Sequence, residues 1–83
     1  MEKSKSVIYV TRMITTTPRS ELYNLIKDFP LKRSEINFLI DIVEGLSYKE
    51  LAIKYSKSTS RIGKWKREIC DKVQKYQMRK IMH

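Results

Sequence analysis

Residues 47–62 read SYKELAIKYSKSTSRI, and this stretch decides the fold. Ser47 and Glu50 have the spacing of a capping box, in which each side chain bonds to the backbone amide of the other residue at a helix start. Polar residues at 56–58 then interrupt the apolar pattern, and the last of them can cap a second helix. A short helix, a polar turn and a second helix form a helix-turn-helix. The sequence predicts this motif over residues 47–73.

Two helices are predicted before this motif. The first begins at Thr17-Pro18, a capping residue followed by a proline that suits the first turn, and it ends at Pro30. The second spans Lys32 to Glu44 and stops at Gly45, where a left-handed cap is wanted. The last helix is expected to run to about residue 80. The apolar stripes of the three longer helices are Leu22, Leu25, Ile26 and Phe29; Ile36, Leu39, Ile40 and Val43; and Ile62, Trp65, Ile69, Val73 and Tyr76.

The amino-terminal segment 6–17 (SVIYVTRMITTT) is rich in β-branched residues in an alternating pattern, which predicts a strand. The chain contains no second predicted strand for it to pair with. Three arrangements stay open: pairing with the same strand of a second copy, an extended arm over the helices, or a helix. The expected fold class is all-α, a helix-turn-helix bundle of four helices at 17–83 with an N-terminal β-strand or extended arm at 1–16.

Charge is distributed unevenly along the chain. The 83 residues carry 18 lysines and arginines against 9 acidic residues, a net charge of +9. Residues 31–56 carry four bases and four acids, whereas residues 57–83 carry nine bases and two acids, net +7. A neutral support beside a basic helix predicts contact with a polyanion. No membrane contact is expected, because the basic helix keeps its apolar residues for a core or a partner and no apolar run approaches the roughly 18–20 residues of a span.

Several classes of protein are excluded by composition. One cysteine, Cys70, and one histidine, His83, allow neither an internal disulfide nor a zinc site of the usual type. No nucleophile-base pattern or phosphate loop is present, so we expect no enzyme, no metal and no cofactor. The apolar run after the charged start breaks at Arg12, so no signal peptide is predicted and a reducing cytoplasm is expected. Cys70 is expected to be a buried small hydrophobe.

The segment from Leu31 to Val73 resembles the helix-turn-helix domain of LuxR/GerE-type transcription regulators, and it is similar also to the promoter-reading (region 4) domain of sigma factors. The likeness is strongest in the opening at residues 31–35 and in residues 44–52, EGLSYKELA. Tyr48 favours the sigma version, whereas the spacing from residue 31 to residue 45 favours the LuxR version. The resemblance implies that the helix from about Thr59 enters the major groove of DNA.

The chain departs from this family in the turn and in the second helix. Ser56 and Lys57 stand where the family has a glycine and an aliphatic residue. Lys57 must therefore lay its stem along the core or point toward phosphate. Gly63 costs this helix up to about 1 kcal/mol relative to alanine. Two explanations stay open: it allows close approach of the backbone to DNA, or the helix orders only on binding. Trp65 is expected in the core rather than stacked on a base, and residues 63–67, GKWKR, resemble segments of phage terminase small subunits and transposases.

The outward side of the second helix is expected to present hydroxyl groups, a guanidinium and an ammonium, and no acid. Such groups suit base edges and phosphates. Leu51, Ala52 and Ile62 are expected to hold the two helices of the motif together. The predicted DNA-binding residues are Lys57, Ser58, Thr59, Ser60, Arg61, Lys64, Lys66 and Arg67.

The function expected first is a sequence-specific, double-stranded DNA-binding transcription regulator, a stand-alone unit with no receiver or ligand-sensing domain before it. A homodimer is expected because one such motif reads few base pairs. Tyr76, Ile81 and Met82 would pack in that dimer or fold back on the helix that begins at Pro18. Two alternatives stay open: a terminase-like DNA-recognition subunit of a phage or mobile element, and a sigma-like protein that binds host RNA polymerase.

Overall fold

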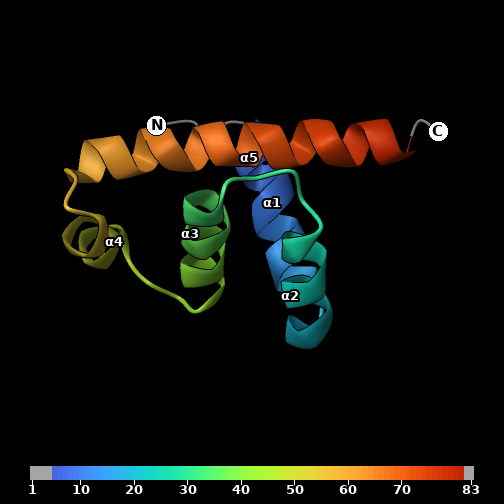
Figure 1. Cartoon of the computed structure of the whole chain (residues 1–83), viewed down its shortest axis with the longest axis horizontal. Helices are drawn as coiled ribbons and strands as arrows, with labels where there is room; N and C mark the ends of the chain where they lie inside the picture. The colour runs from blue at the N-terminus through green and yellow to red at the C-terminus, as the bar shows by residue number, and fades with distance from the viewer. Residues whose placement is uncertain (1–4, 82–83) are drawn as a thin grey trace.

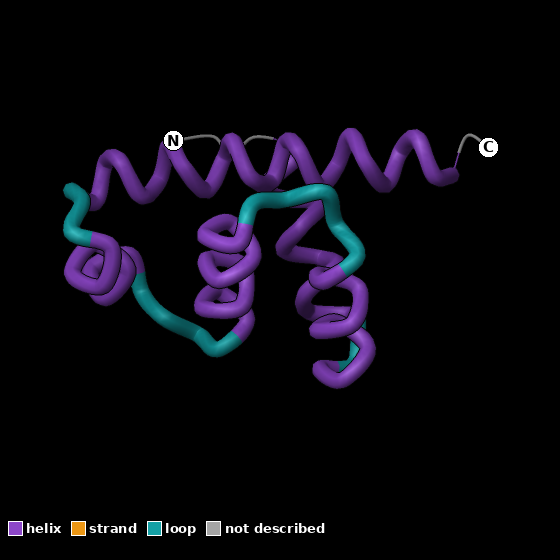
Figure 2. The backbone as a smooth tube through the Cα atoms, in the orientation of Figure 1, coloured by secondary structure: helices purple, strands orange, loops and turns teal. Residues whose placement is uncertain are grey.

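The computed structural model describes residues 5–81, and this part of the chain forms five α-helices and no strand (Figures 1 and 2). The all-α prediction is confirmed, with one helix more than the four expected. In Figure 1 the last helix lies across one end of the molecule, and the other helices lie below or behind it. The helices are α1 (Lys5–Thr16), α2 (Arg19–Lys27), α3 (Arg33–Val43), α4 (Tyr48–Tyr55) and α5 (Thr59–Ile81).

The amino-terminal segment forms α1, so the predicted strand or extended arm is wrong. Val7 and Val10 are three residues apart, and the helix places both in the core, where they are 6% and 2% exposed. α1 packs against α5, and the Ser6 hydroxyl donates a hydrogen bond to Asp71 of α5. β-branched residues favour strands by only a small free energy, which burial readily overrides. Helix formation here buries the two valines without needing a partner strand.

α2 begins one residue later than predicted. Pro18 occupies the cap position of α2, and no side chain among the described residues caps it, so the prediction that Thr17 caps this helix is wrong. α2 packs against α3, and Phe29, just after α2, meets Tyr76 of α5 edge to face with ring centroids 5.7 Å apart. Tyr76 thus folds back on the segment that follows α2. The side chain of Ile81 and all of Met82 lie outside the described residues.

The end of α3 follows the prediction closely. Gly45 has a φ of 92°, the left-handed conformation that glycine adopts at low cost. Its amide donates to the Ile42 carbonyl at 3.0 Å, and the Leu46 amide donates to the Asp41 carbonyl at 3.1 Å. These two bonds form a Schellman motif and satisfy carbonyl groups that the helix end would otherwise leave unpaired.

The apolar face of α5 is the centre of the core. Ile62, Ile69, Cys70 and Val73 are all fully buried on α5, as its apolar stripe predicts. Burial raises the pKa of the Cys70 thiol to about 11, so this thiol stays protonated at neutral pH. The prediction that Cys70 is a small buried hydrophobe is confirmed. None of the helices within residues 5–81 combines the length and the hydropathy that crossing a membrane requires.

An ion pair between a buried carboxylate and an exposed lysine joins the start of α3 to the middle of α5. Lys72 Nζ lies 2.7 Å from Glu35 Oε2, and the Lys32 amide donates to Glu35 Oε1 at 3.0 Å. Burial by itself would raise the pKa of Glu35, but the hydrogen bonds from Lys72 and from the Lys32 amide outweigh it and leave the pKa lowered. The fold therefore favours the ionised form of Glu35.

This pair predicts a dependence of stability on acid pH. Because the folded-state pKa of Glu35 is below its ordinary value of 4.5, its contribution is complete above that value and is lost as the pH falls through the folded-state pKa. Glu35→Gln should lower the free energy of unfolding at pH 7 by roughly 1 kcal/mol, and by clearly less at pH 3, in urea titrations. Glu21→Gln, at an exposed position on α2, is the control, and an equal loss from Glu35→Gln at both pH values would contradict the prediction.

Candidate nucleic-acid interface

The first helix of the predicted motif begins as a capping box. The Glu50 amide donates to Ser47 Oγ at 3.2 Å, and the Ser47 amide donates to Glu50 Oε1 at 3.0 Å. Hydrogen bonding of the Glu50 carboxylate by the Ser47 amide, and then by the Ser47 side chain, lowers the pKa of Glu50, so the ionised form that the box needs is favoured. Leu51 is fully buried and Ala52 is half-buried, which confirms that this face of α4 packs against the rest of the motif.

The turn between α4 and α5 uses a left-handed serine. Ser56 has φ 54° and ψ 46°, and the Lys57 amide donates to the Ala52 carbonyl at 2.9 Å. This left-handed conformation is the one that glycine adopts at low cost, and here a serine adopts it. A side chain with a Cβ is strained there by about 1 kcal/mol.

α5, the second helix of the motif, starts where the sequence predicts. Ser58 Oγ accepts a hydrogen bond from the Arg61 amide at 3.2 Å, so Ser58 caps α5. α5 is 23 residues long and extends to Ile81, in agreement with the predicted end near residue 80. The helix continues without a break through Gly63. The first turns of α5 are therefore helical.

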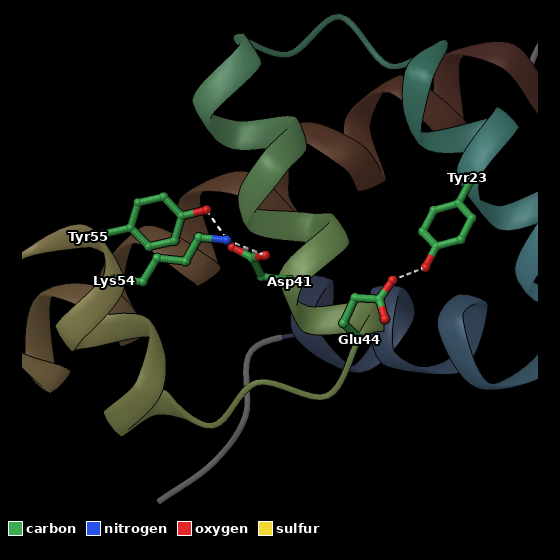
Figure 3. Close-up of polar contacts among 5 residues, drawn as sticks. All are labelled: Tyr23, Asp41, Glu44, Lys54 and Tyr55. Atoms are coloured by element: carbon green, nitrogen blue, oxygen red, sulfur yellow. Dashed lines mark hydrogen bonds and ion pairs between the residues drawn. The ribbon is translucent and has the colours of Figure 1, made fainter.

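Asp41 of α3 holds the end of α4 in place (Figure 3). It is 7% exposed, and it accepts hydrogen bonds from Lys54 Nζ at 2.7 Å and from the Tyr55 hydroxyl at 2.5 Å. Burial and the bond to Asp41 both raise the pKa of Tyr55, so the phenol stays protonated and keeps donating. At the other side of α3, the Tyr23 hydroxyl of α2 donates to Glu44. The two bonds to Asp41 hold the end of α4, and hence the turn and the start of α5, in place.

Seven of the eight predicted DNA-binding residues are exposed on the turn or on α5. The exception is Lys66, which is half-buried with Nζ 5.2 Å from the centroid of the Tyr48 ring. Lys66 thus covers an aromatic face of α4 instead of projecting outward. The exposed seven are Lys57, Ser58, Thr59, Ser60, Arg61, Lys64 and Arg67.

A hollow of about 460 Å³ lies beside the first turns of α5. It brings together three of the predicted residues, Lys57, Arg61 and Lys64, whereas Arg67 is not among the residues that line it. Its lining also includes side chains that were not predicted: Ser34 of α3, Tyr55 of α4, and Trp65 and Glu68 of α5.

Glu68 could have been found from the sequence, because it lies four residues after Lys64 and therefore on the same side of the helix. Ser34 could not, since no local pattern places the start of α3 next to α5. The expectation of an acid-free outward face is therefore incomplete. The hollow combines three cations, two aromatic side chains, a hydroxyl and one carboxylate.

Trp65 joins the hollow to the core. Its ring centroid lies 4.5 Å from that of Phe38 and 5.1 Å from that of Tyr55, so one side of the indole packs on the interior as predicted. Lys57 is exposed, and its Nζ lies 5.7 Å from the Trp65 centroid, within the range of a cation–π contact. Of the two expected positions for Lys57, along the core or pointing outward, the side chain takes the exposed one, beside the Trp65 ring.

These groups can bind anions and the polar edges of bases. Among the described residues, no group of three His, Cys, Asp or Glu side chains is placed to hold a metal ion. The Arg61 and Lys64 side chains are long and exposed, so they can reach a ligand several ångströms from the helix surface. The charges that line the hollow suit a negatively charged partner.

The left-handed serine leads to a stability prediction. Ser56→Gly should raise the free energy of unfolding by roughly 0.5–1 kcal/mol, because glycine removes the Cβ strain and loses part of that gain through its greater freedom in the unfolded chain. Ser20→Gly, in the first turn of α2 where the backbone is helical, should lower it by up to about 0.5 kcal/mol. Urea titrations measure both, and a destabilised Ser56→Gly would contradict the account of the turn.

Gly63 gives a second, two-part prediction. A Cβ built at Gly63 meets no neighbouring atom within 4 Å, so Gly63→Ala should raise the free energy of unfolding by up to about 1 kcal/mol through helix propensity alone. Thermal unfolding measures this effect. If the backbone at this position approaches DNA, the same variant should bind duplex at least tenfold more weakly although it is more stable. A loss of stability would show that the residue has a packing role.

Comparison of the chain with protein-family profiles, with curated proteins and with solved structures gave no match. The resemblance to LuxR/GerE-type and sigma domains therefore rests on residues 31–73 alone.

Proposed function

We propose that this chain is a sequence-specific, double-stranded DNA-binding transcription regulator, and that the first turns of α5 enter the major groove. One observation carries this: the exposed, hydroxyl-rich and basic side of α5 begins at a fixed turn and lies opposite a fully buried apolar side. An α-helix with its side chains is about 10–12 Å wide, and the major groove is about 12 Å wide. α5 can therefore enter the groove while α4 braces it against α3.

The exposed residues have distinct roles in this proposal. Arg61 and Lys64 are long enough to reach base edges, where Arg and Lys donate to guanine acceptors. Thr59 and Ser60 stand on the first turn, where hydroxyls commonly bond phosphate or bases. Ser58 already accepts the Arg61 amide, and its hydroxyl hydrogen is left to donate to a phosphate.

Glu68 adds selectivity in this arrangement. A carboxylate beside Lys64 and Arg61 repels phosphate and so lowers the affinity for unrelated duplexes. A carboxylate can accept from the cytosine amino group in the major groove. The presence of Glu68 in a hollow with three bases supports a protein that discriminates among sequences over one that coats DNA.

Alanine substitution tests the roles of Arg61 and Lys64. Each of Arg61→Ala and Lys64→Ala should cost roughly 1–3 kcal/mol of binding free energy on the preferred duplex if its side chain reaches a base. Fluorescence anisotropy on the preferred and a scrambled duplex measures the loss, which should be larger on the preferred one. Arg12→Ala, at an exposed position of α1, is the control. Equal losses on both duplexes would reassign the residue to phosphate contact.

The preferred duplex comes from selection out of a random duplex pool. A defined consensus supports sequence-specific binding, and equal recovery of all sequences contradicts it. The proposed homodimer also predicts the symmetry of the site. Two-fold symmetry in the protein requires a palindromic site whose half-sites lie about 34–36 Å apart, or multiples of that distance. A consensus without inverted repeats would argue for a single chain on DNA.

A further inference from the structure

Six positions of α5 follow one another at spacings of three or four residues and so lie along one side of the helix. We call this set the basic stripe. Five of its six members are bases, and it continues well past the residues that line the hollow. The basic stripe consists of Arg61, Lys64, Glu68, Lys72, Lys75 and Arg79.

Contacts with α3 show which side of the molecule the basic stripe occupies. Lys72 is ion-paired with Glu35, in the first turn of α3. Ser34, the neighbouring residue, lines the hollow together with Arg61 and Lys64. The basic stripe therefore passes the start of α3, where Lys32 and Arg33 are also exposed. Two further bases thus lie beside the middle of the basic stripe.

The last two members of the basic stripe, Lys75 and Arg79, form what we call its rear, and neither has a carboxylate partner among the described residues. Within residues 5–81, Lys72 is the one member of the basic stripe that forms an ion pair. Lys75 and Arg79 are exposed, and α5 contains no acid after Asp71. The region beyond the core therefore presents a positive surface that continues the one at the start of α5.

The two ends of the basic stripe are too far apart to contact the same base pairs. Lys75 and Arg79 follow Lys64 by 11 and 15 residues, which is about 17 and 23 Å along the helix. DNA rises about 3.4 Å per base pair, so these spans correspond to roughly five to seven base pairs. Lys75 and Arg79 are therefore too far away to share the base pairs that the first turns of α5 would read.

We infer that Lys75 and Arg79 contact backbone phosphates of the same duplex, several base pairs to one side of the site that the first turns of α5 read. This inference rests on the proposed function. It extends the surface that one chain lays on DNA beyond the helix-turn-helix, and it assigns the carboxyl-terminal turns of α5 to affinity and positioning rather than to base readout.

An anionic membrane is the weaker partner for this surface. A helix that lies in a lipid interface needs a wide apolar face, and the apolar face of α5 is buried against the other helices. Met78 is the one large, exposed hydrophobic side chain on α5 among the described residues. The rear of the basic stripe thus offers charge with little apolar area.

The test compares two double variants of the full chain that remove the same charge. Lys75→Gln with Arg79→Gln removes the rear of the basic stripe. Arg12→Gln with Arg19→Gln is the control, because both residues are exposed and belong to α1 and α2 rather than to α5. The connection between α1 and α2 lies at the end of the molecule away from α5 (Figure 1). Circular dichroism and thermal unfolding confirm that both variants fold, and anisotropy measures their affinity for a 20-base-pair duplex across a range of salt concentrations.

The rear variant should reduce the slope of log affinity against log salt by about 1.8, or about 0.9 for each lost phosphate contact. At 0.1 M salt this corresponds to a loss on the order of tenfold per contact, equal on the preferred and scrambled duplexes. Its hydroxyl-radical footprint should shorten at one end if a single chain binds, and at two positions related by the two-fold axis if a dimer binds. The control should keep the slope, affinity and footprint of the unaltered chain.

Three results would overturn the inference. An unaltered slope and footprint in the rear variant, with the original chain binding DNA, would overturn it and leave the proposed function standing. If the original chain binds no duplex, the proposed function fails as well. If the rear variant keeps its DNA affinity but loses binding to vesicles of anionic phospholipid or to an acidic polypeptide, the surface belongs to that partner.

Discussion

The structure depends on the burial of one side of α5. Ile62, Ile69 and Val73 are fully buried there, and α5 is the helix on which both α1 and α4 pack. Burying such a side chain contributes about 1.5–3 kcal/mol relative to leaving it exposed. Once that side is committed to the core, the opposite side of the same helix must face solvent. The bases of α5 can then gather there without losing their hydration, so the core and the proposed DNA-binding surface follow from one periodicity.

α3 orients the motif through two buried carboxylates. Glu35 pairs with Lys72 of α5, and Asp41 pairs with Lys54 and Tyr55 of α4. An unpaired carboxylate in the interior would cost several kcal/mol, so each pair restricts α3 to docking positions in which its partner is in reach. Their effect on the fold is to specify how the helices meet, while the apolar contacts supply most of the stability.

Local signals in the sequence were enough to predict most of the helix boundaries. The capping box at Ser47 and Glu50, the cap at Ser58 and the left-handed Gly45 all act within a few residues, so their outcome depends little on the rest of the chain. The amino-terminal segment was mispredicted because β-branched residues also satisfy a helical spacing at Val7 and Val10. Packing against α5 decided between the two, and intrinsic propensity is too weak to resist it.

The sequence by itself determined the all-α class, the order of α2 to α5 and the exposed bases at the start of α5. The tertiary structure alone decided that α1 is a helix, that Tyr76 folds back on Phe29, and that Ser34 and Tyr55 share a hollow with Arg61 and Lys64. Capping and helical periodicity involve residues three or four apart, which a sequence displays directly. Contacts between helices depend on how buried faces and paired charges dock together, and that is settled only when the whole core closes.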